Sequence, residues 1–168
     1  GRRVAVDPAI PCGKCEFCLE GNPNLCPEVR FAGHGETDGA LRQEMSWPDR
    51  CLFELSDSLN DADGAMLEPL GIALHAVDLS HLRPGMQVGV FGCGPIGLLI
   101  VQLARLSGAL RIVATDRKVH RLEAARALGA DETWLVEENG VVPELVSRLG
   151  RRGVDVAFEA AGENSAVE

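Results

Sequence analysis

Residues 87–116, QVGVFGCGPIGLLIVQLARLSGALRIVATD, place a glycine-rich turn between a short β-like run and a strongly apolar segment. The run Val88 to Phe91 leads into Gly-Cys-Gly-Pro-Ile-Gly, and a helix is expected from about Ile96 to Leu106. A second strand, Arg111 to Thr115, ends at Asp116. A strand, a helix and a second strand at this spacing form a βαβ unit, whose strands are parallel. The stretch therefore predicts a parallel α/β sheet.

The glycine spacing of this turn also predicts a ligand. A lone G-x-G-x-x-G is weak evidence, but here it follows a strand, opens a helix and precedes an acid about 20 positions on, which is the context of a dinucleotide-binding site. There Gly92 permits a tight turn, Gly94 lets a diphosphate approach the backbone, and Gly97 lets the helix pack on the strand. Pro95 directly precedes the expected helix and Ile96 begins it; the N-terminus of a helix favours negative charge. The alternative is a glycine-rich turn of some other α/β protein.

The acid at the end of the second strand predicts which dinucleotide binds. Asp116 would accept hydrogen bonds from the adenosine ribose hydroxyls, whereas a 2′-phosphate at that place would face a like charge. The sequence therefore favours NAD over NADP. Arg117 and Lys118 follow directly and could soften the preference.

The remaining pattern predicts a second, different domain. After Asp116 come an amphipathic helix (VHRLEAARALGAD), a strand (TWLV), a helix (VVPELVSRLG) and a fourth strand (VDVAFEAAG), so an incomplete doubly wound sheet is expected, about four strands of the usual six. Upstream, short half-alternating segments separated by Gly, Pro and Asp predict a β-rich domain. The sequence pattern changes from β-like to helical near Asp61 to Ala65, which predicts one domain over residues 1–64 and another over 65–168.

The segment PCGKCEFCLEGNPNLC, residues 11–26, carries four cysteines at the spacing C-x2-C-x2-C-x7-C: Cys12, Cys15, Cys18 and Cys26. Four thiolates that converge suit tetrahedral zinc, and a site closed by four cysteines is structural, with no open position for catalysis. The apolar residues Phe17, Leu19 and Leu25 are the only ones this lobe could bury. Zinc would therefore supply most of its folding free energy, on the order of 10 kcal/mol.

Two other interpretations of the cysteines stay open. An iron–sulfur cluster would suit the C-x2-C-x2-C start, although ferredoxin-type runs place the fourth cysteine three residues on. Disulfides would need an export context, and the chain opens with no secretory signal pattern. Six cysteines in such a chain predict a reducing, cytoplasmic compartment. Cys51 and Cys93 stand apart and are expected to be buried small hydrophobes.

Composition excludes several classes of partner. The formal net charge of −9 argues against binding to nucleic acid or to an anionic membrane. No apolar run reaches the roughly 20 residues that span a bilayer, since Arg105 interrupts the longest one. The chain has no initiator methionine and ends within its sheet pattern, so a fragment of a longer protein is expected.

Along nearly its whole length the chain resembles the zinc-dependent medium-chain alcohol and polyol dehydrogenases. The matching pieces come in the family's order: GRRVAVDPAIPCGKCEFCLEGNPNLC, DGALRQEM, AMLEPLGIALHAV, RPGMQVGVFGCGPIGLL and ATDRKVHRLEAARALGAD. The resemblance implies a GroES-like catalytic domain, here its C-terminal portion with the structural zinc lobe, followed by a truncated Rossmann domain that binds NAD. It also implies oxidation of a secondary alcohol or polyol, a second, catalytic zinc, and a homodimer or homotetramer.

The resemblance gives roles to two further residues. Glu68, in LEPL, stands where ethanol-type enzymes have a cysteine ligand, which indicates the sorbitol and threonine dehydrogenase branch and a contact with the catalytic zinc, direct or through water. Its other interpretation is a helix N-terminal acid stabilised by the dipole. Arg121 matches an arginine near the adenosine end, and would otherwise be a solvated helix charge. His75 is expected to be a packed helix residue and His34 a loop residue.

The resemblance also shows what this segment lacks. The family's other ligands to the catalytic zinc, a cysteine and a His-Glu pair, precede the region that matches Gly1, and the chain has no cysteine before Cys12 and no His-Glu pair. These 168 residues alone are expected to have little or no dehydrogenase activity. The alternatives are a zinc-stabilised nucleotide-binding module without catalysis, or an iron–sulfur redox protein.

Overall fold

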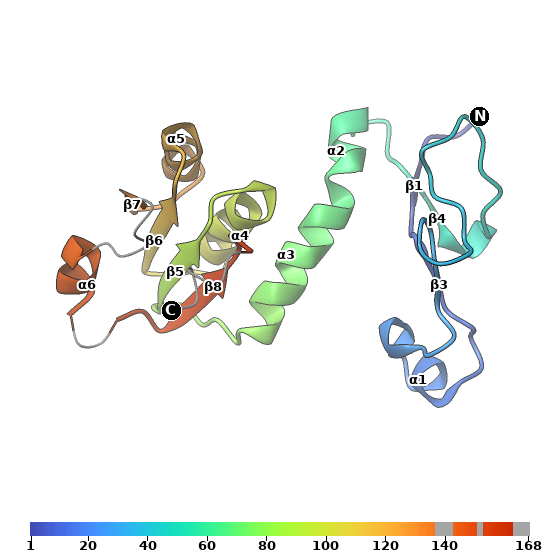
Figure 1. Ribbon diagram of the computed structural model, residues 1–168, viewed down its shortest axis with the longest axis horizontal. Coiled ribbons are helices and arrows are strands. Elements are labelled where there is room, and N and C mark those ends of the chain that lie inside the picture. Colours follow the sequence, from blue (N-terminus) through green and yellow to red (C-terminus); the bar gives the residue numbers. More distant parts are fainter. Residues whose placement is uncertain (137–142, 151–152, 163–168) are drawn as a thin grey trace. The chain divides into compact units, whose positions relative to one another are not determined.

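Four parallel strands form the sheet in the second half of the chain: β5 (Gln87–Phe91), β6 (Arg111–Asp116), β7 (Glu132–Leu135) and β8 (Val156–Glu159). They lie in the order β7-β6-β5-β8, and every neighbouring pair is parallel (Figure 1). The computed structural model describes residues 1–136, 143–150 and 153–162; residues 141–142, the start of the helix expected from VVPELVSRLG, lie outside this range. The parallel α/β sheet predicted from the sequence is confirmed.

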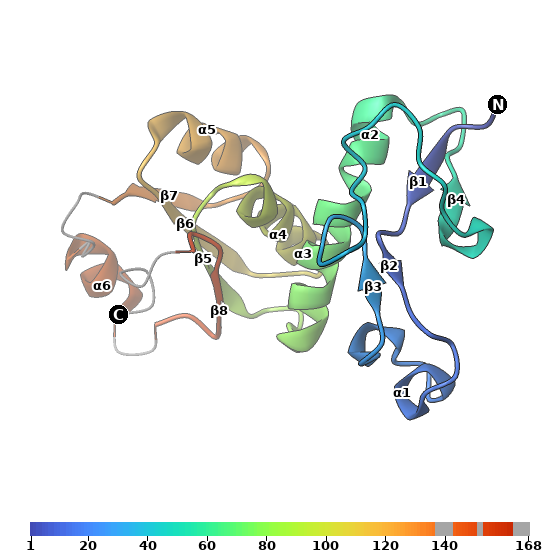
Figure 2. The same cartoon turned by 45° about the vertical axis from the view of Figure 1, so that its right-hand side comes forward.

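Helices flank this sheet: α3 (Leu67–Leu79), α4 (Pro95–Leu106), α5 (Val119–Ala127) and α6 (Pro143–Leu149). Helix α4 packs on β5 and β6, α5 packs on β6 and β7, and the two helices lie side by side (Figure 2). Helix α4 begins at Pro95, one residue before the predicted start, because proline is favoured at the first helical position. The core is made of β-branched strand residues and small helix residues, among them Val88, Val90, Ile112, Val101 and Ala73.

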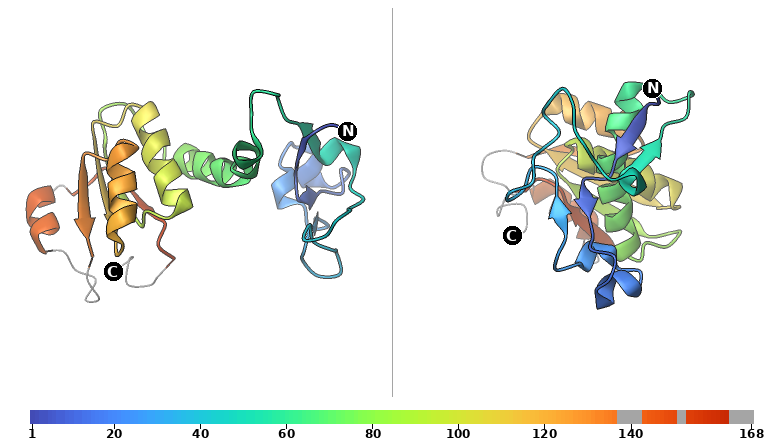
Figure 3. Two further views of the ribbon diagram at one scale, coloured as in Figure 1. Left: turned by 90° about the horizontal axis from the view of Figure 1, so that it is seen from above. Right: turned by 90° about the vertical axis from the view of Figure 1, so that its right-hand side faces the viewer.

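The chain divides into two compact units, Gly1–Leu67 and Glu68–Glu168. The first has short antiparallel pairs: β1 (Val4–Val6) with β4 (Leu52–Glu54), and β2 (Ala9–Ile10) with β3 (Arg30–Phe31). Between β2 and β3 lies the cysteine lobe, with α1 (Glu16–Leu19) and a 3-10 turn (Pro23–Leu25), at the far end of this pair from β1 (Figure 3). A second 3-10 turn (Asp49–Cys51) precedes β4, and α2 (Asp61–Ala65) closes the unit.

The lobe has almost no core, as the sequence predicts. Phe17, Leu19 and Leu25 are exposed, Leu19 at 75%, so the lobe does not bury even these three apolar side chains. Its buried residue is Cys26, at 3% exposure. So short a segment, rich in turns, has no interior large enough for them. The lobe therefore gains almost no hydrophobic stabilisation of its own.

Among the described residues, no helix combines the length and the apolar composition needed to cross a membrane.

Replacing His81 with glycine is expected to stabilise the second unit slightly. His81 follows the end of α3 and has a φ of +53°, a left-handed conformation that side chains with a Cβ adopt at a cost. Because glycine adopts it freely but also enlarges the entropy of the unfolded chain, the net gain should be about 0.5 kcal/mol. Thermal unfolding of H81G beside the wild type measures it. An unchanged or lower melting temperature would contradict the expectation.

Candidate metal and dinucleotide sites

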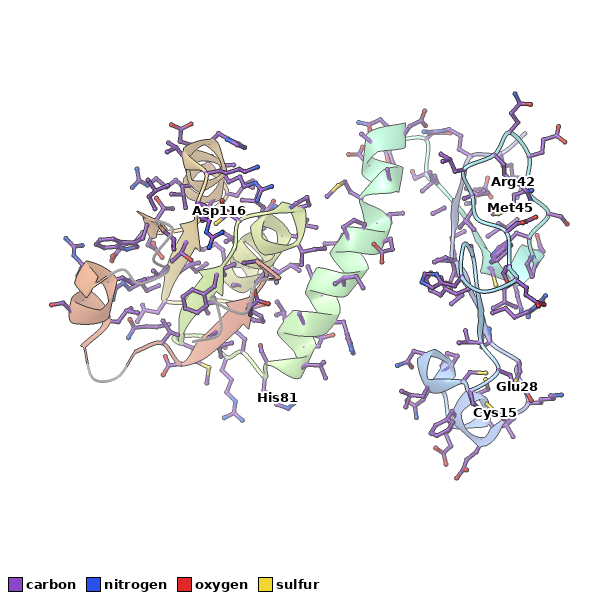
Figure 4. All side chains as sticks on the ribbon, viewed as in Figure 1. Cys15, Glu28, Arg42, Met45, His81 and Asp116 are labelled. Carbon is purple, nitrogen blue, oxygen red and sulfur yellow. The ribbon has the colours of Figure 1, made fainter. Side chains whose placement is uncertain are left out.

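The four cysteines of the lobe come together in space. The sulfur atoms of Cys12, Cys15, Cys18 and Cys26 all lie within 4.8 Å of one another (Cys15 is labelled in Figure 4). Cys15 is the N-cap of α1, Cys18 lies within α1, and Cys26 follows the 3-10 turn. Cys12 lies just before them, and its sulfur accepts the N–H of Cys15. Among the described residues this is the only group of three or more histidine, cysteine or carboxylate ligands at such distances.

Backbone donors surround the cluster. The N–H groups of Lys14 and Cys15 donate to Cys12 Sγ at 3.5 and 3.4 Å, and the N–H of Cys12 donates to Cys26 Sγ at 3.3 Å. The bond from Lys14 is the main reason that the pKa of the Cys12 thiol is lowered to about 7, against an opposing effect of burial. At Cys15 the N–H of Cys18 lowers the pKa, but burial and the neighbouring thiols outweigh it and raise the pKa to about 12. One thiolate therefore forms readily and the next does not, unless a cation joins them.

The glycine-rich turn joins β5 to α4 in the second unit. Gly92 has a φ of +102°, and a Cβ there would lie 2.6 Å from backbone atoms of Ala160 and Ala161, just after β8. A Cβ on Gly97 would lie 1.9 Å from the Gly92 carbonyl oxygen, so only glycine lets α4 approach the turn this closely.

Gly94 differs from these two glycines. It is the N-cap of α4, its φ is −71°, and a Cβ there would meet only a terminal nitrogen of Arg121, at 4.0 Å. The protein therefore does not need glycine at this position for its own packing. The space that a Cβ would take lies before the first turn of α4, whose backbone N–H groups have no acceptor within the helix. This open cradle at a helix N-terminus fits a diphosphate.

Asp116 ends β6 beside this turn. Its side chain is 6% exposed, its Oδ2 accepts the N–H of Cys93 at 2.8 Å, and its Oδ1 accepts the N–H of Lys118 at 2.8 Å. Arg121, from the first turn of α5, places a terminal nitrogen 3.5 Å from Asp116 Oδ2. The predicted dinucleotide residues thus share one place at the carboxyl ends of the strands (Asp116 is labelled in Figure 4). In parallel sheets, ligands bind at that edge where the strand order reverses, here between β5 and β8.

Cys93 and Cys51 are buried, as the sequence predicts, at 0% and 4% exposure. Burial and, after it, the charge of Asp116 raise the pKa of the Cys93 thiol to about 11, against the opposing effect of Arg121. The thiol of Cys93 therefore stays protonated, and it points to the carbonyl of Thr115 at 3.5 Å.

The sequence reasoning missed Glu159 at the end of β8. Its Oε1 accepts the N–H groups of Ala161 and Gly162, both at 2.8 Å, and so shapes the segment that borders Gly92. An acid at the end of the fourth strand, in FEAAG, was the available signal.

Glu68 begins the second unit in the first turn of α3, and it is exposed. It belongs to no ligand cluster among the described residues, so its metal role remains a hypothesis. His75 is exposed on α3, so the expectation of a packed residue is wrong. His34 lies in a turn after β3 with its ring edge-on to Phe31, at 5.3 Å between centroids.

Comparison with known proteins finds relatives for both halves of the chain. A model described as "Alcohol dehydrogenase GroES-like domain" matches residues 1–57, and one described as "Zinc-binding dehydrogenase" matches residues 95–168. Sorbitol dehydrogenase of Bacillus subtilis is 39% identical over 168 residues, which are 100% of this chain and 48% of that protein. The chain thus spans about half the length of the curated relatives it matches.

Solved structures give the same result. An oxidoreductase/dehydrogenase of unknown specificity from Escherichia coli has a TM-score of 0.90 at 32% identity, over 99% of this chain and 48% of that one. A Sinorhizobium meliloti protein bound to NADP has a TM-score of 0.87 at 36% identity, over 100% of this chain and 49% of that one. The β-rich unit with four clustered cysteines and the parallel sheet that follows it are thus similar to zinc-binding dehydrogenases. The chain belongs to the zinc-dependent medium-chain alcohol and polyol dehydrogenase family.

Proposed function

We propose that this chain is part of an oxidoreductase that transfers a hydride between a secondary alcohol or polyol and NAD. The observation that carries the proposal is the open cradle at Gly94, beside the buried carboxylate of Asp116, at the reversal point of the sheet. Residues 1–64 are assigned to the GroES-like catalytic domain and 65–168 to the Rossmann domain. The similarity to a sorbitol dehydrogenase supports a polyol as substrate.

Different residues of the site are proposed to bind different parts of the dinucleotide. Gly92, Gly94, Pro95, Ile96 and Gly97 bring the start of α4 against the diphosphate, and Asp116 accepts the adenosine ribose hydroxyls. Arg121 lies at the adenosine end, beside Asp116. The nicotinamide, when bound, accepts or gives the hydride. This chain's part is to orient the cofactor.

The four-cysteine cluster is proposed to hold a structural zinc ion. Four sulfur donors within 4.8 Å suit tetrahedral zinc, and a cluster closed by four thiolates leaves no position for substrate. The proposed catalytic zinc, a Lewis acid for the substrate hydroxyl, would be touched by Glu68 directly or through water. No other residue of this chain is proposed as its ligand. A cytoplasmic homo-oligomer, dimer or tetramer, completes the proposal.

NAD is proposed over NADP because Asp116 is buried and negative where a 2′-phosphate would bind. The Sinorhizobium meliloti neighbour was solved with NADP, so the preference needs its own measurement. A titration with NADH and NADPH, followed by nicotinamide fluorescence, provides it. Equal or tighter binding of NADPH would contradict the assignment of Asp116.

Replacing Gly94 with alanine is expected to weaken dinucleotide binding strongly while the fold persists. The added methyl meets no atom closer than 4.0 Å, but it fills the space in which the diphosphate would approach the backbone. The Kd for NADH should rise at least about 30-fold, a loss of roughly 2 kcal/mol. The melting temperature should stay within a few degrees of the wild type. Unchanged NADH affinity in folded G94A would contradict the proposed site.

The enzyme itself is tested with a polyol panel. The protein isolated from its own source is assayed with sorbitol, xylitol, butanediol and threonine in the presence of NAD, and its zinc content is measured by native mass spectrometry. Two zinc ions in a subunit larger than 17.9 kDa, with NAD reduction by at least one substrate, would support the proposal. A 17.9 kDa subunit with one zinc and no activity would contradict it.

A further inference from the structure

The carboxylate of Asp116 joins two backbone segments that are far apart in the sequence. Its Oδ2 accepts the N–H of Cys93, 23 residues earlier, at the centre of the glycine-rich turn. Its Oδ1 accepts the N–H of Lys118, in the loop that leads into α5. One side chain thus ties the end of β6 to the turn that follows β5.

This tie is buried. Asp116 is 8% exposed and Cys93 is fully buried, so water cannot replace the carboxylate as the acceptor for this N–H. A hydrogen bond from a backbone N–H to a carboxylate is stronger than one between neutral groups. The negative charge of Asp116 also acts on Cys93, since it contributes to the raised pKa of that thiol. The turn therefore has a strong side-chain anchor at its centre.

The other hydrogen bonds described between the turn and β6 go to the Thr115 carbonyl. The N–H of Gly92 donates to the Thr115 carbonyl at 2.8 Å, and the Cys93 thiol points to the same oxygen. This one acceptor belongs to the backbone, which a substitution leaves in place. Asp116 is the side chain that fixes the direction of the Cys93 peptide, next to the open cradle at Gly94.

We propose that Asp116 is a positioning residue for the diphosphate-binding turn, a role separate from its expected contact with the adenosine ribose. The carboxylate holds the turn in its binding shape before any dinucleotide arrives, so that binding does not have to order it. Arg121, with a terminal nitrogen 3.5 Å from Asp116 Oδ2 and beside Gly94, keeps a positive charge at this anchor. The inference rests on the proposed function for the identity of the ligand, but not for the state of the turn.

The first test measures the turn without ligand. Amide hydrogen exchange at Cys93 is followed by NMR in the purified protein, in Asp116→Asn and in Asp116→Ser. Asparagine can still accept the Cys93 N–H through its carbonyl oxygen, but its NH₂ then faces the N–H of Lys118, so an intermediate effect is expected. In Asp116→Ser, exchange at Cys93 should be at least about tenfold faster, as expected for the loss of a hydrogen bond to a charged group.

Two controls separate a local effect from general destabilisation. Glu123→Gln removes one negative charge from an exposed position on α5 and should leave Cys93 exchange unchanged. The amides of Val90 and Val113, in the buried strands, should exchange as slowly in the Asp116 variants as in the wild type. If Cys93 is no faster in either Asp116 variant, or if Val90 and Val113 accelerate equally, the positioning role is wrong.

The second test separates the turn from the ribose contact. Binding of ADP and of 2′,3′-dideoxy-ADP is measured calorimetrically for the wild type and both Asp116 variants. If Asp116 only touches the ribose hydroxyls, its replacement should weaken the binding of ADP and leave the binding of dideoxy-ADP unchanged. That result would contradict the proposal. We expect Asp116→Ser to weaken the binding of both ligands, with an increase of about tenfold in the Kd for dideoxy-ADP. If the wild type binds neither ligand, the proposed function fails, and the exchange data still decide the positioning role.

Discussion

Replacing Cys26 with alanine is expected to release zinc from the lobe and to unfold residues 12–26 while the parallel sheet keeps its stability. Cys26 is one of four sulfur atoms in the cluster and is the buried member of the lobe. The apolar side chains Phe17, Leu19 and Leu25 are exposed, so no hydrophobic core replaces the metal. The change should therefore remove the free energy of a structural zinc site, on the order of 10 kcal/mol.

The measurement combines zinc content with thiol reactivity. In the wild type the four cluster thiols should react slowly with a thiol reagent until a strong chelator removes the metal. In C26A the three remaining cluster cysteines should react at once, and zinc content should fall by about one equivalent per chain. Cys93, fully buried in the second unit, should stay unreactive in both proteins.

Cys51 offers a matched control. It is buried to the same degree, 4% against 3% exposed, in the same unit, and its thiol points to the Ala9 carbonyl at 3.6 Å. Cys51→Ala removes the same atom from outside the cluster, so it should retain zinc and cost only about 1 kcal/mol. Loss of zinc from both variants, or from neither, would contradict the assignment of the metal to the four-cysteine cluster.

The sequence was sufficient where local spacing determines the structure. The order strand, turn, helix and strand between residues 87 and 116 is encoded by adjacent residues, and it folds as predicted. The C-x2-C-x2-C-x7-C spacing likewise brings four sulfur atoms together, because the turns between them are local. In both cases the residues that determine the geometry are near one another in the chain.

Contacts between distant segments could not be predicted in this way. A role for Gly92 in the tight turn follows from the motif, but its contact with Ala160 depends on β8 pairing beside β5. The acceptor role of Asp116 toward Cys93 also requires the register between β5 and β6. The small interior of the lobe was predictable, because a short segment rich in turns offers only Phe17, Leu19 and Leu25 for burial; that all three are exposed comes from the structure alone.

Replacing Gly97 with alanine is expected to destabilise the second unit severely. The new Cβ would lie 1.9 Å from the Gly92 carbonyl oxygen and 2.9 Å from its carbon, which are backbone atoms and cannot rotate away. Helix α4 would have to move off β5, and the buried contacts of Val101 and Ala104 with the sheet would loosen. We expect a loss of at least about 3 kcal/mol, the upper range for overpacking a core. In a unit of this size that lowers the melting temperature by at least roughly 12 °C.

Gly71→Ala is the control for the substitution itself. Gly71 lies within α3, and a Cβ there meets nothing within 4 Å, so alanine should stabilise the helix by about 0.5–1 kcal/mol. The same added methyl group is therefore expected to lower the free energy of unfolding at Gly97, which faces backbone atoms, and to raise it at Gly71, which faces open space. Differential scanning calorimetry of the two variants beside the wild type measures both changes in melting temperature. A melting temperature of G97A within a few degrees of the wild type would show that α4 can yield at this point, and close packing could not then be the reason for glycine at position 97.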